Sequence, residues 1–411
     1  MHRILILALA FAVLCPAAPA GAQARGREPR RPRLEAAADT NSASAYYSHG
    51  VRILERAPAE AADAFYWATR LEPGWADAWY ARRIALLMSR PERFGDYLRG
   101  ARRVIESAEM RAIDSLHYRA LMLNPFVRTK FDKQAFEYQV RHAVKRENPN
   151  DRIDDSELGY LIDQFLRLSG PSTRAWVAYG DGRFPEALSL YATALRGARG
   201  RSRSGIHAER ARIFLLVGRP DSAVAEMTRA VEQMRERDDR DLVFLYESKA
   251  LYEHSIGVML EQQGNAAGAR EAYGRALQED LSYYPAHVAL ASLALSAGDT
   301  TTALSEMDLA VQIRGDEPTV LHTYGHMLAA IGRTDEAAAQ FRRAIAAEPY
   351  YAEPYLLLGI MLERKGDVAG ALEQYRAFLA RASRNHQFRV PVQTRVDQAG
   401  AGGGTTREVE Q

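Results

Sequence analysis

The chain has 411 residues, of which 47% are hydrophobic, and its formal net charge is only +2. This balance argues against a nucleic-acid-binding protein, which needs basic residues concentrated on one face. The single cysteine, Cys15, excludes an internal disulfide framework and a cysteine-based metal site.

Residues 1–24 have the features of a secretory signal peptide. Arg3 supplies a positive charge, residues 4–14 form an apolar run, and small residues over 20–24 offer a cleavage site. The apolar run is too short to span a bilayer as a helix. We therefore expect export to a bacterial periplasm or cell envelope. A signal peptide retained as an anchor and a lipidated Cys15 are the alternatives.

A linker rich in arginine and proline follows at residues 25–40. Its first part, RGREPRRPR at 25–33, carries five arginines against Glu28. We expect a solvated connection to the first helix. The alternative is weak contact of this arm with an anionic membrane or cell-wall surface.

Two helical stretches come next. Residues 41–90 place Ala61, Phe65 and Ala68 at helical spacing, which predicts N-terminal helices of the repeat type described below. Residues 91–167 keep helical spacing of apolar residues but show no repeat period, so they predict an irregular helical segment. This segment is either a set of degenerate repeats or a helical insert that contacts a partner.

Residues 168–383 repeat, and the period is 34 residues over the clearest part, 250–383. Two columns show the period, one running through Gly264, Gly298, Gly332 and Gly366 and the other through Tyr273, Met307, Phe341 and Tyr375. A fixed period in this range indicates a solenoid, in which each unit packs mainly on its neighbours. About six units fit into this stretch.

One unit is predicted to be two antiparallel helices joined by a short turn. Gly264 ends the first helix, because glycine readily adopts the left-handed conformation that follows a helix C-terminus. Gly257, inside the first helix, lets the neighbouring helix approach closely, and Tyr273 is the large residue between the two. After the last unit, the glycine-rich residues 384–411 predict a disordered tail.

These columns resemble the tetratricopeptide repeat. The clearest copy, at 318–351, shows the pattern at Leu321, Tyr324, Gly325, Leu328, Gly332, Ala337, Phe341, Ala344 and Pro349. The resemblance implies an all-α fold: a right-handed α-solenoid of antiparallel helix pairs, with the irregular segment near its N-terminal half. It also implies a non-catalytic scaffold that binds a protein or peptide, without a cofactor and without nucleic acid.

In this family the first helices line a concave groove, and two columns of this chain should face it. The predicted groove residues are Trp176, Arg212, His254, Val258, Val288, His322, His326, Leu356 and Ile360. Trp176 and Arg212 are the leading binding candidates, because aromatic and arginine side chains are enriched at binding hot spots. The alternative for Trp176 is packing against the helices upstream.

Two other functions stay open at this point. His322 and His326 lie four residues apart on a first helix, so a third ligand could complete a metal site. A metal-dependent binder or enzyme would use this pair together with the 91–167 segment. A self-assembling envelope spacer is the other alternative. No phosphate-binding glycine loop, nucleophile elbow or HExxH motif is found, so we expect no enzyme and no bound metal.

Overall fold

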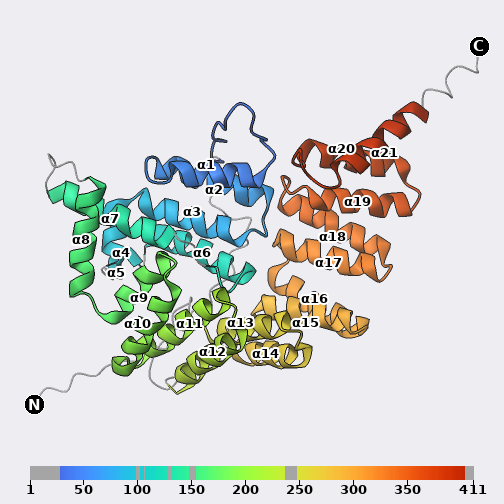
Figure 1. Cartoon of the computed structure of the whole chain (residues 1–411). Coiled ribbons are helices and arrows are strands. Elements are labelled where there is room, and N and C mark those ends of the chain that lie inside the picture. The colour runs from blue at the N-terminus through green and yellow to red at the C-terminus, as the bar shows by residue number, and fades with distance from the viewer. Residues whose placement is uncertain are drawn as a thin grey trace, which may run out of the picture.

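The computed structural model describes residues 28–98, 102–105, 107–127, 131–147, 154–236 and 248–402, and every regular element in these ranges is an α-helix. The fold is an all-α solenoid of antiparallel helix pairs, as the repeat period predicted (Figure 1). The predicted signal peptide, 1–24, lies outside the described residues. Among the described helices, none combines the length and apolar character needed to cross a bilayer.

The described residues of the N-terminal part form eight helices. They are α1 (Ala43–Ile53), α2 (Pro58–Leu71), α3 (Ala76–Met88), α4 (Pro91–Leu98), α5 (Arg102–Ile105), α6 (Ala108–Leu123), α7 (Phe131–Glu147) and α8 (Asp155–Leu168). Consecutive helices α1, α2 and α3 pack on one another. After α3 the order breaks, because α3 packs more on α6 and α7 than on the next helix in the chain, α4. This skipping of neighbours explains why no repeat period is visible over 91–167.

Six consecutive helix pairs follow. They are α9 (Pro171–Gly180) with α10 (Phe184–Gly197), α11 (Arg201–Leu216) with α12 (Pro220–Arg235), α13 (Lys249–Gln262) with α14 (Ala266–Glu279), α15 (Tyr284–Ser296) with α16 (Thr300–Arg314), α17 (Pro318–Ala330) with α18 (Thr334–Ala347), and α19 (Glu353–Arg364) with α20 (Val368–Arg381). A last helix, α21 (Arg389–Gly402), packs on α20.

Glycines have two distinct structural roles in a pair, as the sequence predicted. Gly264, in the turn between α13 and α14, has φ +77°, the left-handed conformation that most side chains avoid. Gly325, inside α17, lies against the buried ring of Phe341 on α18. A Cβ at Gly325 would lie 2.6 Å from Phe341 Cε1, well inside the ordinary carbon–carbon contact distance of about 3.5 Å. The first glycine ends a helix, and the second lets two helices pack closely.

The solenoid curves until its two ends meet. In Figure 1, α1 and α2 lie beside the last helix pairs, and α6 extends toward the centre of the molecule. Asn41 Nδ2 donates to the carbonyl of Ala380 at 2.8 Å, and the rings of Trp67 and Tyr350 meet edge to face at 5.1 Å. One continuous hydrophobic cluster therefore joins residues of the N-terminal helices to residues of α13–α21.

The structure corrects part of the prediction of a solvated linker over 25–40, of which residues 25–27 lie outside the described residues. Glu28, Pro29, Arg31 and Leu34 lie against the aromatic cluster where the ends meet, whereas residues 35–37 are exposed. The Arg31 guanidinium lies 4.2 Å from the ring centroid of Trp67, whose Nε1 donates to the carbonyl of Pro29 at 3.1 Å. Local composition suggested a free arm, but the cation–π contact depends on a cluster that forms only when distant helices meet.

The prediction of a disordered tail from residue 384 was also wrong as far as Gly402, where α21 ends. Val392 is buried against the core, and the Arg395 guanidinium bonds to Glu363 Oε1 at 2.6 Å. The prediction of disorder was based on the glycines near residue 402, and local composition does not reveal these contacts. Residues 403–411 lie outside the described residues.

Candidate binding pocket on the concave side

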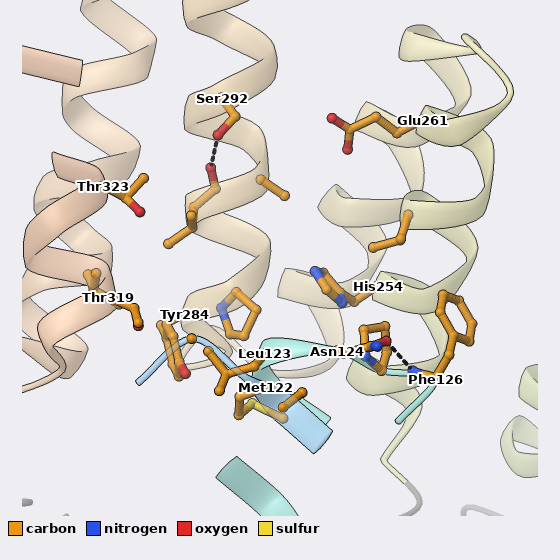
Figure 2. Close-up of a pocket in the computed structure, with 18 of the residues that line it drawn as sticks. Met122, Leu123, Asn124, Phe126, His254, Glu261, Tyr284, Ser292, Thr319 and Thr323 are labelled. Atoms are coloured by element: carbon orange, nitrogen blue, oxygen red, sulfur yellow. Dashed lines mark hydrogen bonds between the residues drawn. The ribbon is translucent and has the colours of Figure 1, made fainter. Parts of the chain in front are cut away.

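A pocket of about 680 Å³ lies between the first helices of three repeats and two loops of the N-terminal part. This volume falls within the range of about 300–1,000 Å³ typical of ligand pockets. The pocket is lined by Gly74, Trp75, Ala76, Asp77, Met122, Leu123, Asn124, Pro125, Phe126, His254, Val258, Glu261, Gln262, Tyr273, Tyr284, Pro285, Val288, Ala289, Ser292, Thr319, Val320 and Thr323. Figure 2 shows 18 of them.

The repeats supply one wall of the pocket through residues four apart on successive first helices. His254 and Val258 come from α13, Val288 and Ser292 from α15, and Thr319 and Thr323 from α17. Residues four apart lie on the same helix face. Because the first helices stack side by side, these pairs form one continuous surface.

The N-terminal part supplies the opposite wall. Gly74 and Trp75 belong to the turn between α2 and α3, Ala76 and Asp77 begin α3, and Met122 to Phe126 form the end of α6 and the turn that follows it. The Asn124 side chain accepts a hydrogen bond from the Phe126 amide at 2.9 Å, which fixes this second turn (Figure 2). The pocket thus exists because the two ends of the solenoid meet.

A buried ion pair holds the two walls together. Arg119, near the end of α6, donates to Glu317 Oε1 at 2.6 Å, and the Glu317 side chain is only 1% exposed. The Arg119 guanidinium also lies 4.0 Å from the ring centroid of Trp79. Such a pair is stable only when its geometry offsets the loss of hydration.

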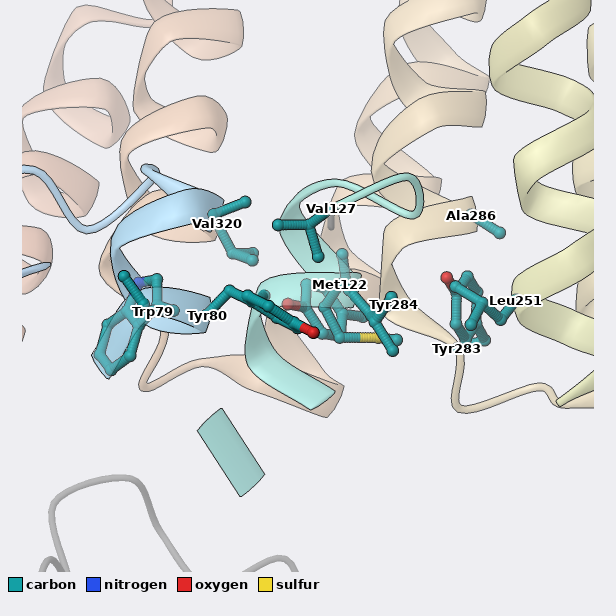
Figure 3. Close-up of a cluster of buried hydrophobic side chains, with 14 of the residues drawn as sticks. Trp79, Tyr80, Met122, Val127, Leu251, Tyr283, Tyr284, Ala286 and Val320 are labelled. Atoms are coloured by element: carbon teal, nitrogen blue, oxygen red, sulfur yellow. The ribbon is translucent and has the colours of Figure 1, made fainter. Parts of the chain in front are cut away.

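A second ion pair, Arg70 Nε to Glu348 Oε2 at 2.6 Å, lies along the same contact. Apolar side chains fill the space around these pairs. Figure 3 shows Tyr80 of α3 and Met122 of α6 near Val320 and Tyr284 of the repeats. The contact between the two ends therefore combines apolar packing with paired charges.

His254 lies at the centre of the lining and is only 6% exposed. Its ring centroid lies 5.3 Å from those of Tyr273 and Tyr283. Burial lowers the pKa of His254 to about 4, so the imidazole is neutral at neutral pH. Its Nδ1 atom is buried and has no hydrogen-bond partner. An unpartnered buried nitrogen is energetically costly.

The charged groups that line the pocket are both carboxylates. Asp77 is half-buried, and burial raises its pKa. Glu261 Oε2 accepts a hydrogen bond from the Tyr273 hydroxyl at 2.6 Å, and burial together with this bond raises the pKa of Tyr273. No lysine or arginine stands among the described lining residues. The pocket is consequently negative and has an aromatic wall.

The structure brings only part of the predicted groove together. Of the nine residues predicted, His254, Val258 and Val288 line the pocket. Leu356 is instead buried in the core at 5% exposure. Ile360 packs against the same core, half-buried. The groove is shorter than the columns implied because the N-terminal helices cover part of the repeat face.

The two leading binding candidates, Trp176 and Arg212, lie outside the pocket. The ring of Trp176 meets Phe136 of α7 edge to face at 5.7 Å, so Trp176 packs against an upstream helix. Arg212 donates to Glu209 Oε1 on its own helix at 2.7 Å. Neither residue lines the described pocket.

The two histidines weighed as metal ligands differ in environment. His322 lies beside the rings of Phe341 and Tyr351, and burial, together with the nearby His326, lowers its pKa to about 4. His326 is exposed. Within the described ranges no group of three or more His, Cys, Asp or Glu residues could hold a metal ion.

No sequence pattern pointed to the N-terminal residues of the pocket. Trp75, Asp77 and Phe126 sit outside the repeat columns, and they reach the repeats only through the closure of the solenoid. Closure depends on the summed rotation between successive helix pairs, which no single repeat motif encodes.

Comparison with known proteins adds a family match. The family model of the tetratricopeptide repeat matches residues 172–239, 257–318 and 325–386. The chain is 31% identical over 90 residues to an uncharacterized protein of Haemophilus influenzae, covering 22% of this chain and 50% of that protein. It is 23% identical over 225 residues to the BBSome complex member bbs-4 of Caenorhabditis elegans, covering 54% and 47%. The chain spans about half the length of these curated relatives.

Solved structures with similar folds cover about half of the chain. The C-terminal part of a TPR repeat-containing protein from Cytophaga hutchinsonii is 15% identical, with a TM-score of 0.41, over 51% of this chain and 78% of that one. YrrB, a TPR protein with an unusual peptide-binding site, is 18% identical, with a TM-score of 0.38, over 50% and 97%. MamA is 17% identical, with a TM-score of 0.35, over 42% and 93%.

Proposed function

The chain carries repeats of the tetratricopeptide family, and from this premise we propose that it is a non-catalytic scaffold that binds a peptide or protein segment in its concave pocket. The observation that carries the proposal is the pocket itself. Three successive first helices line it with a half-buried apolar surface, and residues of the N-terminal part line the opposite wall.

The composition of the lining favours binding over chemistry. Val258, Val288 and Phe126 offer apolar contact area, and the hydroxyl groups of Thr319 and Thr323 lie on one edge, where they can bond a peptide backbone. A catalytic site would need a nucleophile or a general base held by a third group, and the lining residues form no such arrangement.

Export is part of the same proposal. Its support is the charged start, apolar run and small residues of 1–24. We propose that the mature protein works in the periplasm or elsewhere in a bacterial cell envelope. Cell fractionation tests this point: we expect recovery outside the cytoplasm with residues 1–24 removed, and full-length protein confined to the cytoplasm would refute it.

Site-specific photocrosslinking tests the binding proposal. A benzoylphenylalanine at Val288, in the pocket, should form an adduct with a partner in the native host. The same probe at Leu309, 39% exposed on the second helix α16, is the matched control and should not. Val258→Trp, which fills the pocket, should abolish the adduct, whereas Leu309→Trp should leave it. No adduct at Val288, or equal adducts at both positions, would contradict the proposal.

A further inference from the structure

We propose that the pocket selects a basic side chain, an arginine or a lysine, of an extended peptide segment. The inference rests on the proposed function and adds the chemical class of the ligand. It comes from the charge and the aromatic surface of the lining, together with the neutral ring of His254.

The charged residues of the described lining are all acidic. Asp77 stands on the N-terminal wall and Glu261 on the repeat wall, and no lysine or arginine among the described lining residues neutralises them. At the contact between the two ends, two buried carboxylates are matched by arginines. Glu317 pairs with Arg119, and Glu348 pairs with Arg70. The two carboxylates of the pocket thus lack the cation that their neighbours have, and a cationic ligand would supply it.

The aromatic surface suits the same ligand. Trp75, Phe126 and Tyr284 contribute rings to the lining, and cations bind favourably over such rings. The molecule itself shows this recognition where its two ends meet. There the Arg31 guanidinium lies against the rings of Trp67 and Tyr350, at 4.2 Å and 5.2 Å from their centroids.

His254 adds a ring that carries no charge. With its low pKa the imidazole is neutral and does not repel a cation. Its ring centroid lies 5.3 Å from those of Tyr273 and Tyr283, so it extends the aromatic surface of the lining.

A peptide fits this pocket better than a free small amine. The pocket continues along the stacked first helices, and Ser292, Thr319 and Thr323 place hydroxyl groups beside it. Only a chain with its own amide groups would use both these hydroxyls and the charged part of the pocket. The occupant is therefore a peptide segment of a partner protein.

Peptide pools test the inference on the full-length protein. Five pools of random octapeptides carry one fixed central residue: arginine, lysine, citrulline, glutamine or glutamate. We expect the arginine and lysine pools to be retained on immobilised protein about tenfold more than the three others, the effect of one charge-assisted contact. Citrulline is the sharpest comparison, because it keeps the shape of arginine without its charge.

Variants assign the effect to the pocket. Asp77→Asn combined with Glu261→Gln should remove the tenfold preference. Glu271→Gln, an exposed position on α14, is the matched control and should keep it. If the double variant does not fold, a salt titration of the unaltered protein replaces it. Raising NaCl from about 50 mM to about 500 mM should then reduce retention of the arginine pool but not of the glutamine pool.

The outcomes separate the two proposals. Equal retention of all pools would overturn the basic-residue inference and leave peptide binding standing. Retention of no pool would overturn both. A preference that survives in the double variant would place the recognition outside this pocket, and cadaverine competing as strongly as the arginine pool would overturn the peptide part.

Discussion

We expect Gly325→Ala to lower the free energy of unfolding by about 3 kcal/mol, near the upper end of overpacking effects. The new methyl group would lie 2.6 Å from Phe341 Cε1, and Phe341 is completely buried between α17 and α18. The ring has no free space to move into, so the helices must separate. Urea denaturation followed by circular dichroism measures the loss, and amide hydrogen exchange should show it concentrated in α17–α18.

Gly274→Ala is the control. Gly274 lies inside helix α14, and a Cβ there would meet no atom within 4 Å. Alanine is favoured over glycine inside a helix by about 1 kcal/mol, so this variant should be slightly more stable. The same substitution thus has opposite expected signs at two helical positions. Destabilisation of similar size at both positions would refute the close-packing role of Gly325.

We expect His254 to make the protein less stable as the pH falls from about 6.5 toward 4. The pKa of His254 is lowered to about 4 by burial, below the ordinary value of about 6.5 in an unfolded chain. Between these values the unfolded state takes up a proton that the folded state does not. Stability therefore declines with falling pH, and at pH 5 the contribution of this residue is about −2 kcal/mol relative to pH 7.

The measurement is the difference in unfolding free energy between pH 7 and pH 5. In His254→Gln this difference should shrink by about 2 kcal/mol, because glutamine does not titrate. His326→Gln, at an exposed position, should change it much less. Because each variant is compared with itself at the two pH values, the packing cost of the substitution cancels. If this difference is the same in His254→Gln as in the unaltered protein, the imidazole is not held neutral by burial.

The repeat architecture could be read from the sequence because its determinants are local. Gly264 ends a helix through its own backbone conformation, and Gly325 faces Phe341 only 16 positions along the same unit. A motif with a fixed period captures such relations. It therefore predicted the helix pairs and the role of both glycines correctly.

Closure of the solenoid, unlike the repeat architecture, depends on contacts between residues far apart in sequence. Arg119 meets Glu317, and Trp67 meets Tyr350, across distances in sequence that no motif spans. Because closure was not foreseen, the contacts of residues 28–34 with the aromatic cluster were missed. For the same reason Leu356 was placed in an open groove, although it is buried. His254, Val258 and Val288 were named from the first-helix columns alone, since their helices do face the concave side.

The central claim is that the N-terminal loops close over the repeats and complete the pocket. A pair of cysteines tests it most directly: Gly74→Cys with Thr319→Cys, in a Cys15→Ser background. A Cβ at Gly74 would lie 3.7 Å from Thr319 Cγ2, within reach of disulfide geometry. The matched control pairs Gly74→Cys with Thr301→Cys, at the turn end of the α15–α16 hairpin.

Mild oxidation followed by non-reducing electrophoresis and mass spectrometry gives the result. The account predicts rapid, nearly complete disulfide formation within single molecules of the first pair and free thiols in the control. Free thiols in both pairs would contradict closure, and with it the pocket on which the proposed function depends.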